Sequence, residues 1–287
     1  MHSRALVVGG DGRIARALIP ALARAGWDVL ATSRRPGAAP LALDLVEVAR
    51  TGSAQLPDCD VAFVCAAMSG YAECRNAQSR AHAVNAEAPA VIARALAGRG
   101  ARVVLLSTNG VFDGEKPFGA ATDAPDGATV YGRSKALAEA NLRAVDPGAA
   151  VLRLTRVFVP GEPLLAGWAE TLRAREPVEA FADLPAAPVH VEHVVSALLA
   201  IARARSSGIL QISARRQVTY VEIARHIAAR VGASPDLVSP VAAASRGLGP
   251  GEAPRYASLA CDEFLAGFGL APIEPFDVVD AVLGLSR

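Results

Sequence analysis

RALVVGGDGRIA, residues 4–15, is the segment that decides the fold of this chain. Its apolar first half has the length of a strand and breaks at a cluster of three glycines. Apolar residues then recur at helical spacing up to Ala25, and the apolar stretch Trp27–Thr32 again has the length of a strand. A strand, a glycine turn, a helix and a second strand in this order predict a βαβ unit at the start of an α/β protein.

The glycine turn matches a dinucleotide-binding fingerprint. Gly9 and Gly12 would permit the tight turn and the close approach of the backbone to a pyrophosphate. A helix that begins at Arg13 and Ile14 would offer free N–H groups to the phosphates, and Ala15 is small enough to replace the third glycine. We therefore predict that this turn binds a dinucleotide. The alternative is a purely structural strand-to-helix turn.

Strands and helices continue to alternate through the first half of the chain. Continuous apolar strands are predicted at Cys59–Ala67, Arg102–Ser107 and Ala150–Thr155, and helices at Ser79–Leu96 and Ser134–Val145. Strands that are apolar on both faces are typical of a parallel sheet covered by helices on both sides. With right-handed crossovers, this pattern predicts a doubly wound parallel sheet, the Rossmann fold.

The pattern changes beyond residue 160, where proline and glycine become frequent. We therefore predict two domains. Residues 1–160 form the dinucleotide-binding Rossmann domain, to which residues 187–215 return, and residues 161–287 form a small C-terminal substrate-binding lobe.

Composition narrows the classes of function. The chain has 287 residues and a formal net charge of +1, so we expect no nucleic-acid partner. It has no stretch of about 18 apolar residues, so we expect no membrane span. The N-terminal apolar run is too short for a signal peptide, and the four cysteines form no CxxC pair. These features favour a reduced, cytoplasmic protein.

The end of the second predicted strand indicates which cofactor binds. An acidic residue there would bond the ribose 2′-hydroxyl of NAD, but this chain has Ser33, Arg34 and Arg35. A hydroxyl and two guanidiniums suit the 2′-phosphate of NADP(H), which we therefore predict in preference to NAD(H). A solvated loop in an arginine-rich chain is the alternative. Asp44, with Leu45 beside it, would contact the adenine, or Asp44 would cap the following helix.

Tyr131 and Lys135 form the clearest catalytic pattern. They lie four residues apart and would share one face of a helix, where the lysine charge favours the phenolate. The tyrosine can then exchange a proton with a carbonyl oxygen, and the lysine can also hold the nicotinamide ribose. Only Lys116 and Lys135 are lysines among the 29 basic residues. Since arginine supplies the charge elsewhere in the chain, a lysine at this position indicates a specific role. Thr108, just past a strand end, would bond the substrate carbonyl. The alternatives are an exposed helix start and a threonine that only satisfies backbone groups.

These residues lie in segments that resemble the dTDP-4-dehydrorhamnose reductase-like family of extended short-chain dehydrogenases, which bind sugar nucleotides. The resemblance covers nearly the whole chain and is strong over residues 4–160. The matching segments are Val7–Ala15, Cys65–Met68, Val84–Pro89, Ser107–Gly114 (STNGVFDG) and Val130–Glu139 (VYGRSKALAE).

The resemblance implies a function and a set of site residues. Hydride would pass from NADPH to a keto group of a nucleotide-linked sugar, with Thr108, Tyr131 and Lys135 as catalytic residues. Dimers are common in the family, so this chain could form a homodimer, but the sequence does not decide its oligomeric state. By matching motif, the residues that would face the cofactor are Gly9, Gly12, Ala15, Arg34, Ala66 and Ala67, with Asn85 as a further cofactor-site residue.

The chain departs from the family in the residues expected at the substrate. Asn109-Gly110 stands where the family usually carries Asp-Tyr, and Arg156 replaces an aromatic ring. Losing a stacking surface and gaining a cation suggests a different, anionic substrate. We predict Met68, Thr108, Asn109 and Arg156 as substrate contacts.

Two other functions share the same residues. An epimerase or dehydratase would keep its cofactor bound, and a regulatory subunit would bind NADP without catalysis. We expect no metal site, because His190 and His193 lack a third ligand nearby in the sequence.

Overall fold

The computed structural model describes residues 3–35, 37–249 and 251–285. The chain divides into two compact units. The first unit comprises Met1–Phe112, Ala124–Arg153 and Val194–Leu210, and the second comprises Asp113–Asp123, Leu154–His193 and Gln211–Arg287. The assignment of cofactor binding to one domain and of substrate binding to a lobe remains a prediction.

A parallel sheet forms the centre of the first unit. In the part of the chain that the structure describes, seven strands join in the order β11-β6-β5-β4-β1-β2-β3. The pairs β1–β2, β1–β4, β2–β3 and β4–β5 are parallel. This is the predicted doubly wound, Rossmann-like sheet. The strands are β1 (Arg4–Val8), β2 (Asp28–Ser33), β3 (Leu41–Ala42), β4 (Val61–Val64), β5 (Arg102–Thr108), β6 (Ala150–Leu154) and β11 (Gly208–Ile212).

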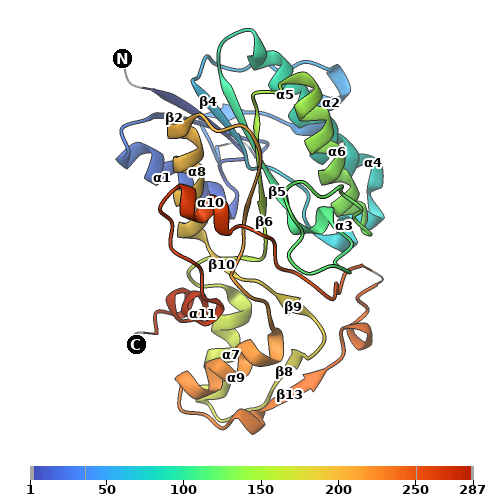
Figure 1. Cartoon of the computed structure of the whole chain (residues 1–287), viewed down its shortest axis with the longest axis vertical. Coiled ribbons are helices and arrows are strands. Elements are labelled where there is room, and N and C mark those ends of the chain that lie inside the picture. The colour runs from blue at the N-terminus through green and yellow to red at the C-terminus, as the bar shows by residue number, and fades with distance from the viewer. Residues whose placement is uncertain (1–2, 36, 250, 286–287) are drawn as a thin grey trace. The chain divides into compact units, whose positions relative to one another are not determined.

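Helices cover both faces of this sheet, and its central strand β4 is apolar throughout. All four residues of β4 are buried. Figure 1 shows α5 and α6 side by side on one face of the sheet, and α1 and α8 on the other. The helices of this unit are α1 (Arg13–Arg24), α2 (Leu45–Thr51), α3 (Tyr71–Asn76), α4 (Gln78–His82), α5 (Ala88–Ala97), α6 (Val130–Val145) and α8 (Val191–Ala204).

A π-helical turn, η1 (Ala83–Glu87), connects α4 to α5. Pro89 follows at the start of α5 and has no backbone N–H to continue the regular α-helical ladder. The wider turn includes Asn85, which is fully buried. A polar side chain thus lies inside the helix layer behind the end of β4.

The second unit consists of short paired strands and helices. Its strand pairs are β7 (Val157–Phe158) with β10 (Val189–His190), β8 (Val178–Phe181) with β13 (Val238–Val241), and β9 (Pro185–Ala186) with β12 (Val218–Thr219). The helices are α7 (Pro163–Arg173), α9 (Tyr220–Arg230), α10 (Asp262–Gly267) and α11 (Pro275–Leu283), and the short 3₁₀ turns are η3 (Pro235–Leu237) and η4 (Ala243–Arg246).

Segment Asp113–Asp123 belongs to the second unit although it lies within the predicted N-terminal domain. It is held by the C-terminal part of the chain, because Gln211 donates from Nε2 to the carbonyl oxygens of Gly119 and Ala260 at 2.9 and 2.8 Å. Such long-range contacts leave no local pattern in the sequence. Among the described residues, no helix has the length and apolar character needed to cross a bilayer.

Two glycines bring the start of α6 against the turn that follows β5. This turn is the 3₁₀ segment η2 (Asn109–Val111), and Gly132 packs on its backbone. A Cβ atom on Gly132 would collide with the carbonyl oxygen of Gly110. The contact sets the distance between the end of β5 and the first turn of α6.

We expect Gly132→Ala to lower the free energy of unfolding by about 1–3 kcal/mol, because one backbone must move away from the other. Gly98→Ala is the matched control in the same unit, since a Cβ there meets open space. It should change stability by less than about 1 kcal/mol. Urea denaturation measures both, and equal effects would show that the close contact does not constrain the fold.

Candidate active site

Thr108, Tyr131 and Lys135 come together at the carboxyl end of β5. Thr108 is the last residue of β5 and is buried. Thr129 caps α6 by accepting a hydrogen bond from the backbone N–H of Gly132 at 3.0 Å, so Tyr131 lies in the first turn. A side-chain hydrogen bond joins Thr108 to Tyr131. Lys135 follows one turn later on the same face.

The environment of Tyr131 keeps its phenol protonated. Burial raises the pKa of Tyr131 above its ordinary value of 10, Tyr71 and Cys74 raise it further, and the Thr108 hydrogen bond lowers it. The lysine charge, which the sequence predicts to lower this pKa, is not among these influences, and desolvation is the largest of them. A neutral phenol is the form that can donate a proton.

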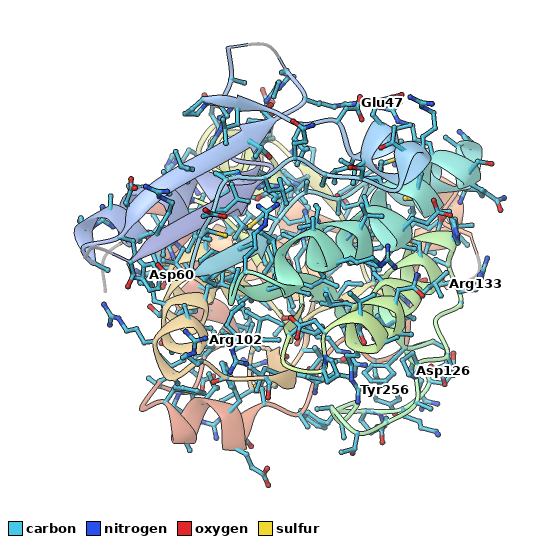
Figure 2. All side chains as sticks on the ribbon, turned by 90° about the horizontal axis from the view of Figure 1, so that it is seen from above. Glu47, Asp60, Arg102, Asp126, Arg133 and Tyr256 are labelled. Atoms are coloured by element: carbon cyan, nitrogen blue, oxygen red, sulfur yellow. The ribbon has the colours of Figure 1, made fainter. Side chains whose placement is uncertain are left out.

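Lys135 is only 1% exposed. Burial lowers the pKa of its ammonium from 10.5 to about 8, while Glu139 and Cys65 oppose this shift. Arg133, by contrast, lies on the outer side of α6 and donates to the carbonyl oxygen of Ala128 at 2.6 Å (Figure 2). A buried ammonium suits a ligand hydroxyl.

The glycine turn has the shape of a phosphate cradle. Gly9 has a φ of +84°, and a Cβ there would lie 2.6 Å from the Cβ of Ala66. Gly12 is the N-cap of α1, whose first turn begins with the exposed Arg13 and the half-buried Ile14 and contains no acidic residue. The backbone N–H groups of this turn therefore face no competing carboxylate of their own helix.

The end of β2 lies beside this turn. Ser33 is buried and its Oγ accepts from the backbone N–H of Arg35 at 3.0 Å. The guanidinium of Arg35 pairs with Asp11, with Nε and Nη2 at 2.6 and 2.5 Å from Oδ2. Burial tends to raise the pKa of Asp11, but the hydrogen bond from Arg35 and other contributions bring it below its ordinary value. Arg34 is exposed. Two arginines thus stand next to the cradle, one of them tied to it.

The structure favours one of the two expectations for Asp44. Its Oδ1 accepts from the backbone N–H of Val46 at 2.8 Å, which caps α2. Leu45 is buried in the hydrophobic core. Adenine contact by these two residues remains a prediction.

Asn85 braces the loop after β4. Its Oδ1 accepts from the backbone N–H of Met68 at 2.8 Å, and its Nδ2 donates to the carbonyl oxygen of Met68 at 2.9 Å and to Ser134 Oγ at 3.0 Å. Ser134 in turn donates to the carbonyl oxygen of Tyr131 at 2.7 Å. The brace connects the loop of Met68 and the exposed Ala67 to the helix of the proton-transfer pair.

The remaining predicted substrate residues lie in different units. Asn109, half-buried in η2 of the first unit, has its Oδ1 3.4 Å from Oγ1 of Thr108. Arg156, in the second unit, lies 3.6 Å from the buried carboxylate of Glu162 and 5.5 Å from the ring centroid of Phe158. Arg156 therefore already has an anionic partner.

Three residues of the site were not predicted from the sequence. The ring of Tyr71 meets that of Tyr131 edge-on, with centroids 6.1 Å apart. Glu139 and Arg153 form a buried ion pair with Nη2 and Oε2 at 2.7 Å. The spacing of four residues between Lys135 and Glu139 was a usable signal, but nothing local indicates that a charged residue is buried.

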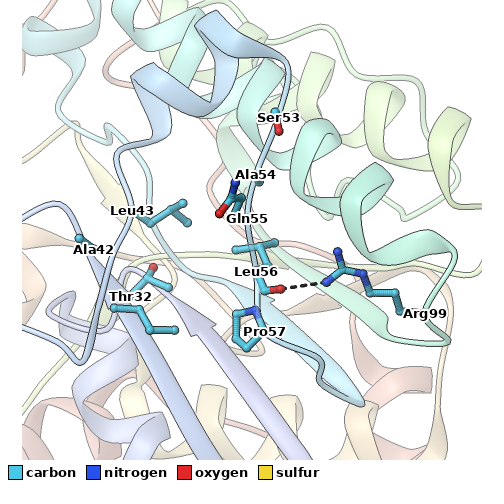
Figure 3. Close-up of a pocket in the computed structure, with 10 residues that line it drawn as sticks. Thr32, Ala42, Leu43, Ser53, Ala54, Gln55, Leu56, Pro57 and Arg99 are labelled. Atoms are coloured by element: carbon cyan, nitrogen blue, oxygen red, sulfur yellow. Dashed lines mark hydrogen bonds between the residues drawn. The ribbon is translucent and has the colours of Figure 1, made fainter.

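Two other features do not match the chemistry of this site. A cavity of about 560 Å³ near β3 is lined by Thr32, Leu41–Leu43, Ser53–Pro57 and Arg99, and Arg99 donates to the carbonyl oxygen of Leu56 at 2.8 Å (Figure 3).

The rings of His190 and His193 lie 6.3 Å apart. In the described part of the chain, no group of three His, Cys, Asp or Glu residues could hold a metal ion.

Known proteins resemble this chain in sequence and in fold. Residues 3–282 match the model of a family described as the RmlD substrate binding domain. The chain is 32% identical to a dTDP-4-dehydrorhamnose reductase of Mycobacterium tuberculosis over 94% of this chain and 88% of that protein. It is 28% identical to one of Mycolicibacterium smegmatis over 99% and 87% of the two chains. The crystal structure of a dTDP-4-dehydrorhamnose reductase from Bacillus anthracis in complex with NADP has the same fold, with a TM-score of 0.83, 20% identity and coverage of 98% and 99%.

The buried ammonium should make stability depend on pH. Between pH 8 and 10.5 the unfolded chain keeps the Lys135 proton while the folded chain loses it, so the free energy of unfolding rises with pH in this window. The rise should be on the order of 3 kcal/mol relative to Lys135→Met, which removes the titrating group. Urea unfolding across this window, in both proteins, measures the difference. Parallel curves would contradict the burial of the ammonium.

Proposed function

Since this chain belongs to the RmlD substrate binding domain family, we propose that it is an NADP(H)-dependent oxidoreductase that reduces a keto group of a nucleotide-linked sugar. The names of its relatives support this reaction, and the proposal depends on one structural observation, the arrangement of three side chains. Tyr131 shares a hydrogen bond with Thr108 and lies one helical turn from the buried Lys135 at the end of a parallel strand. Ligands of doubly wound sheets bind at this edge.

The residues present fit NADP(H). The cradle at Gly9 and Gly12 would hold the pyrophosphate, because only a glycine leaves room beside Ala66. Arg34 and Arg35 would bind the 2′-phosphate. The buried ammonium of Lys135 would bond the nicotinamide ribose. When bound, NADPH would supply the hydride.

Tyr131 is the proton donor in this proposal. Its phenol donates a proton to the carbonyl oxygen, which becomes the hydroxyl of the product, and is left as a phenolate. The ammonium of Lys135, with a pKa of about 8, carries its charge at neutral pH and stabilises this phenolate. Thr108 orients the carbonyl oxygen through its hydroxyl. Solvent then returns the proton to Tyr131.

The relatives indicate the class of substrate. Which sugar it carries depends on the positions at which this chain differs from the family pattern. We propose that Met68 and Asn109 contact the sugar nucleotide, and the contact of Arg156 with the substrate stays a prediction from the sequence. Where the family carries a tyrosine, Gly110 adds no side chain, so a sugar other than that of the rhamnose pathway would fit. The four cysteines, all in the described part of the chain, are free, which suits a cytoplasmic enzyme.

Tyr131→Phe tests the reaction. It should lower kcat by about a thousandfold, because the proton donor is lost, and leave NADPH binding unchanged. Reduction of a panel of 4-keto sugar nucleotides measures kcat, and fluorescence titration measures binding. Tyr256→Phe, which removes a phenol hydroxyl in the second unit, is the matched control and should keep full activity. Retained turnover in Tyr131→Phe would refute the mechanism. Substrate conversion without net NADPH oxidation would favour an epimerase.

Arg34→Ala tests the cofactor. Losing a charged hydrogen bond to the 2′-phosphate should raise KM for NADPH by about tenfold or more and leave KM for NADH unchanged. Arg24→Ala, at the exposed end of α1, is the matched control and should change neither value. An equal rise in KM for NADPH and NADH would mean that Arg34 does not bind the 2′-phosphate.

A further inference from the structure

A buried ion pair lies one turn beyond Lys135 on α6. Glu139 is 2% exposed and Arg153 is fully buried. The Nε of Arg153 donates to both carboxylate oxygens at 3.0 and 3.2 Å, and its Nη2 donates to Oε2 at 2.7 Å. The hydroxyl of Ser107 donates to Oε1 at 2.5 Å. The arginine also lies 4.9 Å from the ring centroid of Phe112.

Stability alone gives little reason for such a pair. Removing two charges from water costs several kcal/mol for each ion, and apolar replacements of similar volume are often as stable. The location of the pair is more informative. Ser107 precedes Thr108 on β5, Glu139 follows Lys135 on α6, and Arg153 lies on β6. The pair thus connects the elements that carry the proton-transfer residues.

We propose that Glu139 is a positioning residue whose ionised carboxylate, held by Arg153 and Ser107, keeps Lys135 protonated. The proposal rests on the proposed function, in which this ammonium stabilises the Tyr131 phenolate. Lys135 and Glu139 lie four residues apart on one helix face, and both are buried. Opposite charges attract more strongly there than they would in water.

The charge of Glu139 acts against desolvation. Burial is the largest influence on Lys135 and lowers its pKa to about 8, and Glu139 is the largest influence in the opposite direction. Without this carboxylate, the ammonium would lose its proton nearer to neutral pH. The enzyme would then lack the charge that stabilises the phenolate.

Arg153 keeps the carboxylate ionised. A buried carboxyl without a partner takes up a proton, because its charged form is the more strongly desolvated. Arginine cannot release its proton in a protein, so Arg153 is a permanent positive partner. The two-oxygen contact and the Ser107 hydrogen bond also hold the carboxylate in one orientation.

No other nearby carboxylate competes for this role in the described residues. Cys65, at the end of β4, also raises the pKa of Lys135, but burial raises its own pKa to about 12, so it stays a neutral thiol at neutral pH. Tyr71 and Cys74, on α3, act on Tyr131. The charged or titratable side chains of α3, α4, η1 and α5 that are exposed are Glu73, Arg75, Arg80, His82, Glu87 and Arg94.

The chain offers a direct measurement, because it has only two lysines, Lys116 and Lys135. Protein grown with carbon-13-labelled lysine and freed of cofactor would show two lysine Cε signals. The Lys116→Arg variant assigns them, and the exposed Lys116 is the internal control. In the wild-type protein, the Lys135 signal should titrate near pH 8. In Glu139→Gln, it should titrate about one pH unit lower or more, while Lys116 stays unchanged.

A second variant separates charge from packing, because Glu139→Gln leaves Arg153 buried without its partner. Glu139→Leu combined with Arg153→Met removes the whole pair and keeps the core apolar. The proposal predicts that Lys135 titrates at lower pH in this folded double variant too. If Lys135 titrates as in the wild type in either folded variant, the proposal is overturned.

Turnover provides the link to the proposed function. The alkaline limb of the kcat/KM profile should move to lower pH in both variants together with the Lys135 titration. If Lys135 titrates at lower pH in the variants but the alkaline limb of kcat/KM does not shift, the catalytic part of the proposal is overturned. If the wild-type protein reduces no sugar nucleotide, the proposed function fails, but the titration still tests the role of Glu139.

Discussion

The burial of one ammonium group is the constraint on which the proposed chemistry depends. Lys135 is 1% exposed, and desolvation alone would favour its neutral form. The same burial raises the pKa of Tyr131, which keeps the phenol protonated until a carbonyl oxygen takes its proton. The site therefore needs a charge that holds the ammonium and a fold that keeps this ammonium out of water. Glu139 supplies the first, and the helix-covered sheet supplies the second.

Backbone contacts then place these groups within reach of one another. Gly132 rests on the carbonyl of Gly110, which sets the first turn of α6 against the end of β5. Asn85 holds the loop after β4 to the same helix through Met68 and Ser134. The first contact requires a glycine at position 132, because a Cβ atom would collide with Gly110. The second requires the polar amide of Asn85. The precision of the site thus comes from packing around α6 rather than from the catalytic side chains themselves.

How much could be predicted depended on whether the signal was local. The glycine turn, the parallel strands and the Tyr131–Lys135 pair follow from short-range patterns, and the structure brings the pair and Thr108 together. Helix α6 begins at Val130, earlier than the predicted Ser134, because the side chain of Thr129 caps it there. The pairing of Glu139 with Arg153 and the edge contact of Tyr71 with Tyr131 join residues distant in the sequence, so local patterns do not predict these contacts.

In the reaction proposed for this chain, a hydride passes to a carbonyl carbon and a proton passes to the carbonyl oxygen. The most direct measurement uses NADPH deuterated at the transferred position, with a 4-keto sugar nucleotide, and analyses the product by mass spectrometry and NMR. One deuterium is expected on the carbon that bears the new hydroxyl, and the hydroxyl proton is expected to come from solvent. A product without deuterium at that carbon would contradict it.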